Sequence, residues 1–326
     1  MSSALLEVTD LRVTMRRSGR EVTPVDGVSF SLARGEILGV VGESGSGKSL
    51  TLRAIIGLLP TGGRASGELR FSTDEAPPRP FVPSDVHGGG ISIVFQEPMA
   101  ALNPTMRVGD LIGEGVRTRI GPSRADVRQR TVELMQLVGI PDAERRARAW
   151  PHQLSGGMRQ RVMIAAALST EPRLLLCDEP TTALDVSIQD QILGLLLELR
   201  RELEMAIIFV SHDLAVIGEL CDRVAVMYAG QIVETGRVRD ITTSPQHPYT
   251  DALIASVPSF QGTSAQLAGI DGRPPDPRGF PVGCRFADRC RFAQADCRQA
   301  PYELVATSAS HATACIHPEV IEGGSA

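Results

Sequence analysis

The pattern with the clearest chemistry in this 326-residue chain is a loop with the spacing G-x-x-x-x-G-K-S. It follows the apolar run Ile37–Val41 and precedes a helical pattern from about Lys48 to Leu59. Glycines in such a loop let backbone N–H groups turn toward a polyphosphate, the lysine supplies positive charge to the β- and γ-phosphates, and the last hydroxyl is placed for Mg²⁺. The start of the helix adds positive potential. The sequence therefore predicts a nucleoside triphosphate site at Gly42, Glu43, Ser44, Gly45, Ser46, Gly47, Lys48 and Ser49.

Two acids end a second apolar run. Leu174–Cys177 reads as a buried strand, and Asp178 and Glu179 follow it directly. Asp178 is suited to hold Mg²⁺ through water, and Glu179 is suited to polarise a water molecule for attack on the γ-phosphate. Capping of the next helix is the structural alternative for the pair. Because the chain also carries the phosphate-binding pattern, we favour the catalytic interpretation.

A third segment, Leu154–Gln160, predicts a helix start that faces an anion. Ser155 is a good N-cap, and Gly156 and Gly157 permit close approach of backbone N–H groups to a phosphate.

Apolar strand-like runs alternate with helical patterns from Leu5 to about Val257, which is typical of an α/β domain with a largely parallel sheet. A change to mostly helical patterns over about 98–160 predicts an inserted helical subdomain, and the proline- and glycine-rich segment 72–90 predicts a surface loop. We expect a boundary near residue 260, which gives domains at 1–258 and 259–326. The runs expected in the central sheet are Ile37–Val41, Ile91–Phe95, Leu174–Cys177 and Ile207–Val210. The runs expected in a smaller sheet are Leu5–Val8, Val28–Leu32, Leu69–Phe71 and Val224–Met227.

The overall charge and hydropathy exclude some classes of protein. The net charge is −5 and the arginines are scattered, which argues against nucleic acid as the main ligand. No apolar run reaches the ~18 residues of a membrane span, and the first residues lack the pattern of a signal peptide. We therefore expect a protein that is made and kept in the cytoplasm, where a partner could hold it at a membrane.

Taken together, these motifs resemble the ATP-binding subunits of ABC transporters over about residues 5–257. The matching elements are Gly42–Ser49, Gln96, Leu154–Gln160, Leu176–Pro180, the triplet Ala183-Leu184-Asp185, and His212. The resemblance implies a head-to-tail dimer in which Ser155, Gly156 and Gly157 act on the partner's nucleotide. It also implies that Gln96 contacts Mg²⁺ and the attacking water, that His212 hydrogen-bonds the γ-phosphate, and that Asp185 joins the two sites. Met15 stands where this family usually has an aromatic ring that stacks on adenine.

Longer segments resemble the ATPases of dipeptide, oligopeptide and nickel importers. They are Gln96–Pro104, Leu154–Ala165 and Ser244–Thr250. Met158 after Ser-Gly-Gly resembles the D-type subunit, which implies a heterodimer with a related F-type ATPase, two permease subunits and an extracytoplasmic binding protein. The expected activity is ATP hydrolysis coupled to uptake of peptides. Alternatives are import of nickel or another small solute, and a soluble ABC ATPase of DNA repair or translation.

Four cysteines are concentrated near the C-terminus. Four thiolates suit either a tetrahedral zinc ion or an iron–sulfur cluster, and the spacing alone does not choose between them. A disulfide is disfavoured in a reducing compartment. The cysteine pattern is similar to the C-terminal region of dipeptide-importer ATPases, which implies a [4Fe–4S] cluster on Cys284, Cys290, Cys297 and Cys315. For zinc, His311 and His317 are candidate substitute ligands.

The resemblance thus implies an ABC ATPase of the P-loop NTPase class. The expected fold is α/β, with a mostly parallel central sheet, an antiparallel β subdomain, an inserted helical subdomain and a loop-rich cysteine-cluster extension. The expected cofactors are ATP, Mg²⁺ at Ser49, Gln96 and Asp178, and the iron–sulfur cluster.

Overall fold

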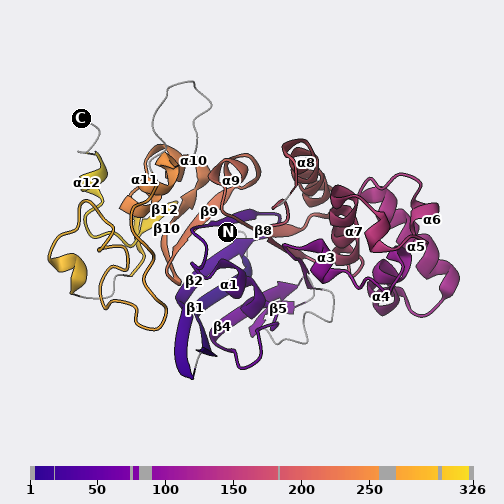
Figure 1. The fold of residues 1–326 in the computed structure, drawn as a ribbon, viewed down its shortest axis with the longest axis horizontal. Coiled ribbons are helices and arrows are strands. Elements are labelled where there is room, and N and C mark those ends of the chain that lie inside the picture. The colour runs from indigo at the N-terminus through magenta and orange to yellow at the C-terminus, as the bar shows by residue number, and fades with distance from the viewer. Residues whose placement is uncertain are drawn as a thin grey trace. The chain divides into compact units, whose positions relative to one another are not determined.

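The computed structural model describes residues 4–17, 19–73, 76–80, 90–182, 184–256, 269–299 and 303–322 (Figure 1). The chain forms two compact units. The first comprises residues 1–5, 33–36 and 72–208, and the second comprises 6–32, 37–71 and 209–326. The boundary falls within strand β8 (Ala206–Ser211). Most of the segment 72–90 and the boundary expected near residue 260 lie outside the described residues.

The second unit begins with an antiparallel sheet. Its long strands are ordered β2-β1-β4, and β1 pairs with β4 from Leu6 opposite Phe71 to Thr14 opposite Arg64. Buried aliphatic side chains recur along β1, which matches the alternation of a strand with one face on a core. The bounds are β1 Ala4–Arg17, β2 Arg20–Ala33 and β4 Arg64–Thr73.

The second unit also carries one end of the larger, eight-stranded sheet, with strands in the order β11-β12-β10-β9-β3. All five residues of β3 are buried, and β3 runs parallel to β9. The run Val224–Met227 therefore belongs to the larger sheet, and its expected place in the smaller sheet is wrong. The reason is that every residue from Val224 to Tyr228 is buried, as in a strand covered on both faces. The elements are β3 Ile37–Val41, α1 Lys48–Ile55, α9 Leu214–Leu220, β9 Arg223–Tyr228, β10 Gln231–Arg237, α10 Val238–Thr243 and α11 Pro248–Ala255.

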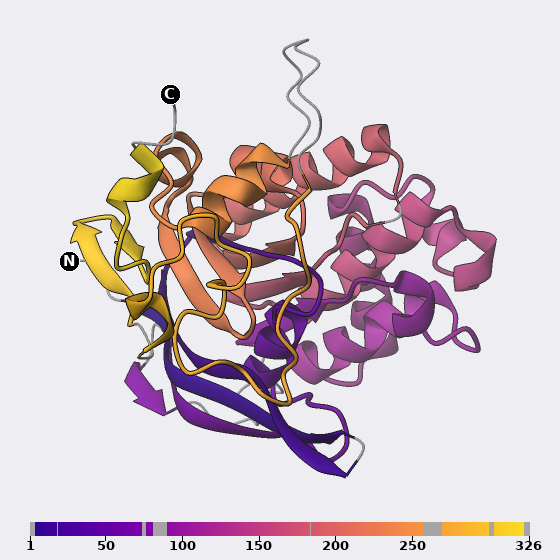
Figure 2. The ribbon, with the colours of Figure 1, turned by 60° about the vertical axis from the view of Figure 1, so that its left-hand side comes forward.

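The C-terminal extension, described over 269–299 and 303–322, packs within the same unit. In Figure 2 its gold chain lies beside the orange strands β9 and β10, and β12 pairs with β10 in antiparallel fashion. Phe286 is only 3% exposed and contacts Tyr228 and Tyr249, so the extension contributes to a core as well as to loops. Its elements are the 3₁₀ turn Asp296–Arg298, β11 Val305–Ser308, β12 His311–Thr313 and α12 Glu319–Glu322.

The first unit contains the remaining strands and most of the helices. Strand β6 runs parallel to β7, and helices follow one another through residues 98–168, where a helical insertion is expected (Figure 1). Among the described residues, the helices include none that is long and apolar enough to cross a membrane. The elements are β5 Ala76–Pro80, β6 Ile91–Val94, α3 Pro98–Ala101, α4 Val108–Ile120, α5 Arg124–Leu137, α6 Ala143–Arg146, the 3₁₀ turn Pro151–Gln153, α7 Gly156–Leu168, β7 Leu174–Asp178 and α8 Val186–Leu203.

Candidate functional site

The phosphate-binding loop connects the end of β3 to the start of α1 in the second unit. Lys48 is 5% exposed, and its Nζ donates to the carbonyl oxygens of Gly42 at 2.7 Å and Glu43 at 3.1 Å. The loop therefore curls around its own lysine. A polyphosphate bound there would meet an ammonium group already held in place at the start of a helix.

Glycine is required at two points of this curl. Gly42 has φ +156°, and a Cβ added there would lie 2.1 Å from the carbonyl oxygen of Met227. Gly47 has φ +104°, and its added Cβ would lie 2.8 Å from the carbonyl oxygen of Pro24. Both values are closer than a Cβ tolerates, so any side chain at these positions would displace the loop.

Ser46 adds an observation that fits an anion. Its side chain is 4% exposed, and within the described part of the chain its Oγ has no hydrogen-bond partner. Buried hydroxyl groups are nearly always hydrogen-bonded, and a phosphate oxygen is an acceptor that would satisfy this one.

The carboxylates and the glutamine belong to the first unit. Asp178 ends β7 and is 2% exposed, and Glu179 follows it with φ +47°. One carboxylate oxygen of Glu179, Oε2, accepts from Gln96 Nε2 at 3.3 Å and from Thr182 Oγ1 at 3.0 Å. A positive φ is uncommon for a residue with a side chain and occurs often at functional sites. The structure thus brings together Gln96 and Glu179, two residues predicted to contact the attacking water.

The predicted anion-facing helix start also forms in the first unit. Ser155 caps α7, and its side chain accepts from Met158 N–H. Gly157 packs closely on the start of α8, since its added Cβ would lie 2.7 Å from Ile188 Cγ2, while an added Cβ at Gly156 would lie 3.7 Å from Leu184. Ala183 of the predicted triplet lies outside the described residues.

Asp185 caps α8 in this structure. It accepts from Ile188 N–H at 3.0 Å and from Ser187 Oγ at 3.0 Å, and these hydrogen bonds lower the pKa of Asp185. His212 is exposed, follows β8 and belongs to the second unit. Their roles across a dimer and at the γ-phosphate stay predictions.

The four C-terminal cysteines belong to the second unit, and charge on Cys284, Cys290 and Cys297 acts on Cys315. Cys284 N–H donates to the carbonyl oxygen of Cys297 at 2.7 Å, and no disulfide joins the six cysteines of the chain. Burial, together with charge on Cys284, Cys290 and Cys297, raises the pKa of Cys315 to about 12. Burial also raises the pKa of Cys284 and Cys290. Partly buried thiols that act on one another can all become thiolates only if a cation compensates their charge.

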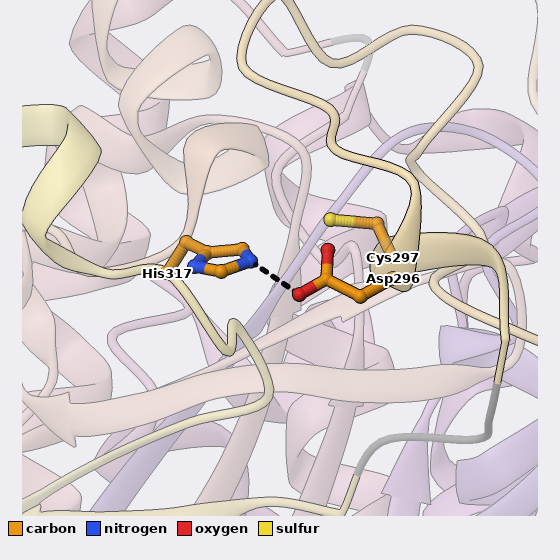
Figure 3. Close-up of side chains that lie close together, drawn as sticks. All are labelled: Asp296, Cys297 and His317. Carbon is orange, nitrogen blue, oxygen red and sulfur yellow. Dashed lines mark hydrogen bonds and ion pairs between the residues drawn. The ribbon is translucent and has the colours of Figure 1, made fainter.

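A second, smaller group shares one of these cysteines. Ligand atoms of Asp296, Cys297 and His317 all lie within 4.8 Å of one another. His317 Nε2 is 2.9 Å from Asp296 Oδ2, and the three side chains converge in Figure 3. The set of carboxylate, thiolate and imidazole is one that zinc accepts.

Arg289 belongs to none of the motifs in the sequence. Its side chain is 5% exposed and pairs with Glu43 of the phosphate-binding loop. The signal in the sequence was weak: Arg289 directly precedes Cys290 in an otherwise loop-like segment.

Two family models match the chain. The model described as ABC transporter matches residues 25–182, and the model described as oligopeptide/dipeptide transporter, C-terminal region, matches residues 233–297. The first match contains the phosphate-binding loop and the two carboxylates, and the second contains Cys284, Cys290 and Cys297.

Curated relatives match along most of their length. The chain is 45% identical to the oligopeptide transport ATP-binding protein OppD of Salmonella typhimurium, over 97% of this chain and 95% of that protein. It is 46% identical to the dipeptide transport ATP-binding protein DppD of Haemophilus influenzae, over 92% of each chain. It is 48% identical to OppD of Bacillus subtilis, over 89% of this chain and 82% of that protein.

Solved structures show the same fold. One is cbiO1 of Clostridium perfringens, part of the ABC transporter complex cbiONQ, with a TM-score of 0.60 and 29% identity over 73% of this chain and 90% of that one. Another is the ATP-binding cassette MJ0796 in a dimeric, post-hydrolysis state with ADP and Pi, with a TM-score of 0.61 and 27% identity over 72% of this chain and 99% of that one.

Proposed function

Because this chain belongs to the ABC transporter family of ATP-binding subunits, we propose that its ATPase activity drives uptake of dipeptides or oligopeptides through a membrane importer. The observation that carries the proposal is the combination of a formed phosphate-binding loop with a C-terminal region of the oligopeptide/dipeptide transporter type. The named relatives are oligopeptide and dipeptide transport proteins, which supports peptide as the solute.

In this proposal, different residues bind ATP and catalyse its hydrolysis. Lys48 and the backbone N–H groups of the loop bind the β- and γ-phosphates, and Ser46 donates its buried hydroxyl. Ser49, Gln96 and Asp178 would hold Mg²⁺, which offsets the charge that develops on the transferred phosphoryl group. Hydrogen bonds from Gln96 and Thr182 orient the Glu179 carboxylate, which accepts the proton of the attacking water.

Completion of the site requires a second ATPase. Ser155, Gly156 and Gly157 would bind the partner's nucleotide from the start of α7, Asp185 would join the two sites, and His212 would bind the γ-phosphate. The partner in this proposal is a related F-type chain. Two permease subunits and an extracytoplasmic binding protein complete the importer, and they hold this subunit at the cytoplasmic face of the membrane.

We propose a [4Fe–4S] cluster on the four cysteines, which would supply the four thiolates that such a cluster requires. The charge of Cys284, Cys290 and Cys297 acts on Cys315, which supports a common site for the four sulfur groups. The cluster would hold the extension together by joining residues 284–297 to Cys315.

Zinc is the alternative occupant. The group of Asp296, Cys297 and His317 supports it, because a carboxylate, a thiolate and an imidazole lie within reach of one ion (Figure 3). Iron, acid-labile sulfide and zinc are to be measured on protein purified without oxygen. About four irons and four sulfides per chain establish the cluster, whereas stoichiometric zinc replaces it.

The transport proposal is tested by reconstitution. The ATPase, its F-type partner and the two permeases are placed in vesicles, and ATP hydrolysis is measured with the binding protein and a set of peptides. We expect peptides to stimulate hydrolysis and to accumulate on the cytoplasmic side. Stimulation by Ni²⁺ and not by peptides would refute the proposed solute, and hydrolysis without any partner dependence would refute the transport role.

A further inference from the structure

Arg289 of the C-terminal extension is bound to the phosphate-binding loop. Its Nη1 donates to Glu43 Oε2 at 2.7 Å and its Nη2 donates to Glu43 Oε1 at 2.9 Å. The Arg289 side chain is 5% exposed and that of Glu43 is 24% exposed, so water screens the pair weakly. Two parallel, charge-assisted bonds of this kind are stronger and more directional than an ordinary ion pair.

The guanidinium of Arg289 is fixed from the other side as well. It donates to the carbonyl oxygens of Ile270 at 3.0 Å and Asp271 at 2.7 Å, and to the hydroxyl of Tyr228 at 3.2 Å. The hydrogen bond to Glu43 is the main reason that the pKa of Arg289 is raised. Arg289 is therefore a fixed positive charge with a defined direction.

Glu43 transmits this restraint to the lysine that binds phosphate. Its backbone N–H donates to the hydroxyl of Tyr249 at 2.8 Å, and its carbonyl oxygen accepts from Lys48 Nζ at 3.1 Å. Arg289, Glu43 and Lys48 thus form a chain of contacts from the extension to the ammonium group.

We infer that Arg289 is a positioning residue for ATP binding. It holds the peptide of Glu43 that orients Lys48, and it neutralises a carboxylate that would otherwise repel a bound triphosphate. Like charges a few ångströms apart in a partly buried loop repel strongly. The extension is then part of the nucleotide site, through a residue that no phosphate-loop motif contains.

The test is a double-mutant cycle on the 326-residue chain. ATP affinity is measured by calorimetry with Mg²⁺ for the wild type, Arg289→Gln, Glu43→Gln and the double variant. We expect Arg289→Gln to weaken ATP binding about tenfold, or about 1.4 kcal/mol. Glu43→Gln should weaken ATP binding less, because it removes the repelling charge together with the restraint. The double variant should bind ATP better than Arg289→Gln alone, because no unpaired carboxylate remains.

Two further measurements separate positioning from folding. Raising the salt concentration should narrow the difference between Arg289→Gln and the wild type, because salt screens the exposed carboxylate. Arg291→Gln is the matched control: Arg291 also flanks Cys290, but its side chain is 68% exposed and pairs with Asp251. It should bind ATP as the wild type does. Arg289→Lys keeps the charge and loses the paired hydrogen bonds. Its ATP affinity should lie between those of the wild type and Arg289→Gln.

Wild-type affinity in Arg289→Gln would overturn the inference. The inference would also be overturned if the double variant lost as much binding free energy as the two single variants lose in sum. Independent effects add in this way, and coupled ones do not. If Arg289→Gln fails to fold, Glu43→Gln compared with the wild type at low and high salt still tests the restraint. An unchanged affinity at both salt concentrations overturns it.

A separate observation concerns the base of the nucleotide. A cavity of about 590 Å³ lies within the second unit beside the phosphate-binding loop. Met15, Val22 and Pro24 of the β1–β2 hairpin line one side, Ser44 and Gly45 of the loop line another, and residues 274–278 of the extension line a third. In Figures 1 and 2 the gold extension passes beside this hairpin.

We propose that residues 274–278 supply a wall of the base site. The segment contributes Pro274, Pro275 and Pro277, whose rings offer rigid apolar faces to a planar base. Arg278 donates to Asp276 at 2.9 Å and holds the turn in shape. These prolines, together with Met15, take the place of the aromatic ring that the sequence lacks there.

The test compares ATP with inorganic tripolyphosphate, which has the phosphates and no base. We expect Pro275→Gly to weaken ATP binding about fivefold, or about 1 kcal/mol, because it removes one apolar face from the base. It should leave tripolyphosphate binding unchanged. Met15→Tyr should strengthen ATP binding and not tripolyphosphate binding. Pro281→Gly, in the same extension but outside this cavity, is the control and should change neither affinity. The proposal would be overturned if Pro275→Gly lost equal affinity for ATP and tripolyphosphate, or if it lost no affinity for ATP.

Discussion

His247 makes the stability of this protein depend on pH. It is the N-cap of α11, its side chain is 1% exposed, and its Nδ1 accepts from Tyr249 N–H at 3.1 Å. Complete burial lowers the pKa of His247 to about 3. The folded protein therefore keeps this imidazole neutral at every pH at which it is expected to work.

The magnitude follows from proton binding in the two states. An unfolded histidine takes up a proton near pH 6.5, while the folded one resists protonation down to about pH 3. The unfolded state thus binds more protons in that window, and the free energy of unfolding falls as pH decreases, by about 1.4 kcal/mol per pH unit. Acidification from pH 7 to pH 5 should cost about 2 kcal/mol through this residue alone.

Urea unfolding of the wild type and of His247→Asn, measured between pH 5 and pH 8, checks this value. Asparagine can still accept from Tyr249 N–H as an N-cap but does not titrate. At pH 8, where histidine is neutral in both states, the variant should be less stable, and the difference measures lost packing. That difference should shrink by about 2 kcal/mol at pH 5. Other titrating groups act equally in both proteins, so curves that stay parallel from pH 8 to pH 5 would refute the reasoning.

Three other perturbations address the nucleotide site and the extension. Glu179→Gln should keep ATP affinity and lower the hydrolysis rate by about 10²–10⁴-fold; a rate near that of the wild type would exclude Glu179 as the base. Gly47→Ala should abolish measurable ATP binding, because the new Cβ would lie 2.8 Å from a carbonyl oxygen. Gly194→Ala is the control, since no described residue lies within 4 Å of its new Cβ. It should raise the stability of the helix by about 0.5–1 kcal/mol. Replacing Cys290 and Cys297 together by serine should remove the metal proposed at the four-cysteine site and lower the melting temperature, as measured by elemental analysis and calorimetry; metal content equal to that of the wild type would exclude the four-cysteine site.

The elements that carry the phosphate chemistry could be predicted from the sequence, because their signals are local. A strand such as Ile37–Val41 is apolar at every position since it is buried on both faces, and the sharp loop after it needs glycine where φ is positive. The start of α7 follows from a serine cap in the same way. These features depend on neighbours within a few residues, so residue type and spacing are enough to find them.

Other features depend on residues that are distant in the chain. Val224–Met227 pairs with β3 rather than with the smaller sheet, and Phe286 is buried against Tyr228 and Tyr249 although its segment reads as loop. The pairing of a strand is decided by which surfaces remain uncovered after the rest of the chain has packed, and no local pattern encodes that.

By itself, therefore, the sequence determined that this protein is an ATPase of the ABC type, and it predicts which loop and which acids take part. Only the tertiary structure decided that the cysteine-bearing extension reaches the same site. Arg289 and Glu43 are separated by 246 positions, and their contact exists because the extension packs on the end of β9 beside the phosphate-binding loop. A buried charge pair between such distant residues forms because packing brings the two side chains together. The spacing of residues along the chain does not indicate such a contact.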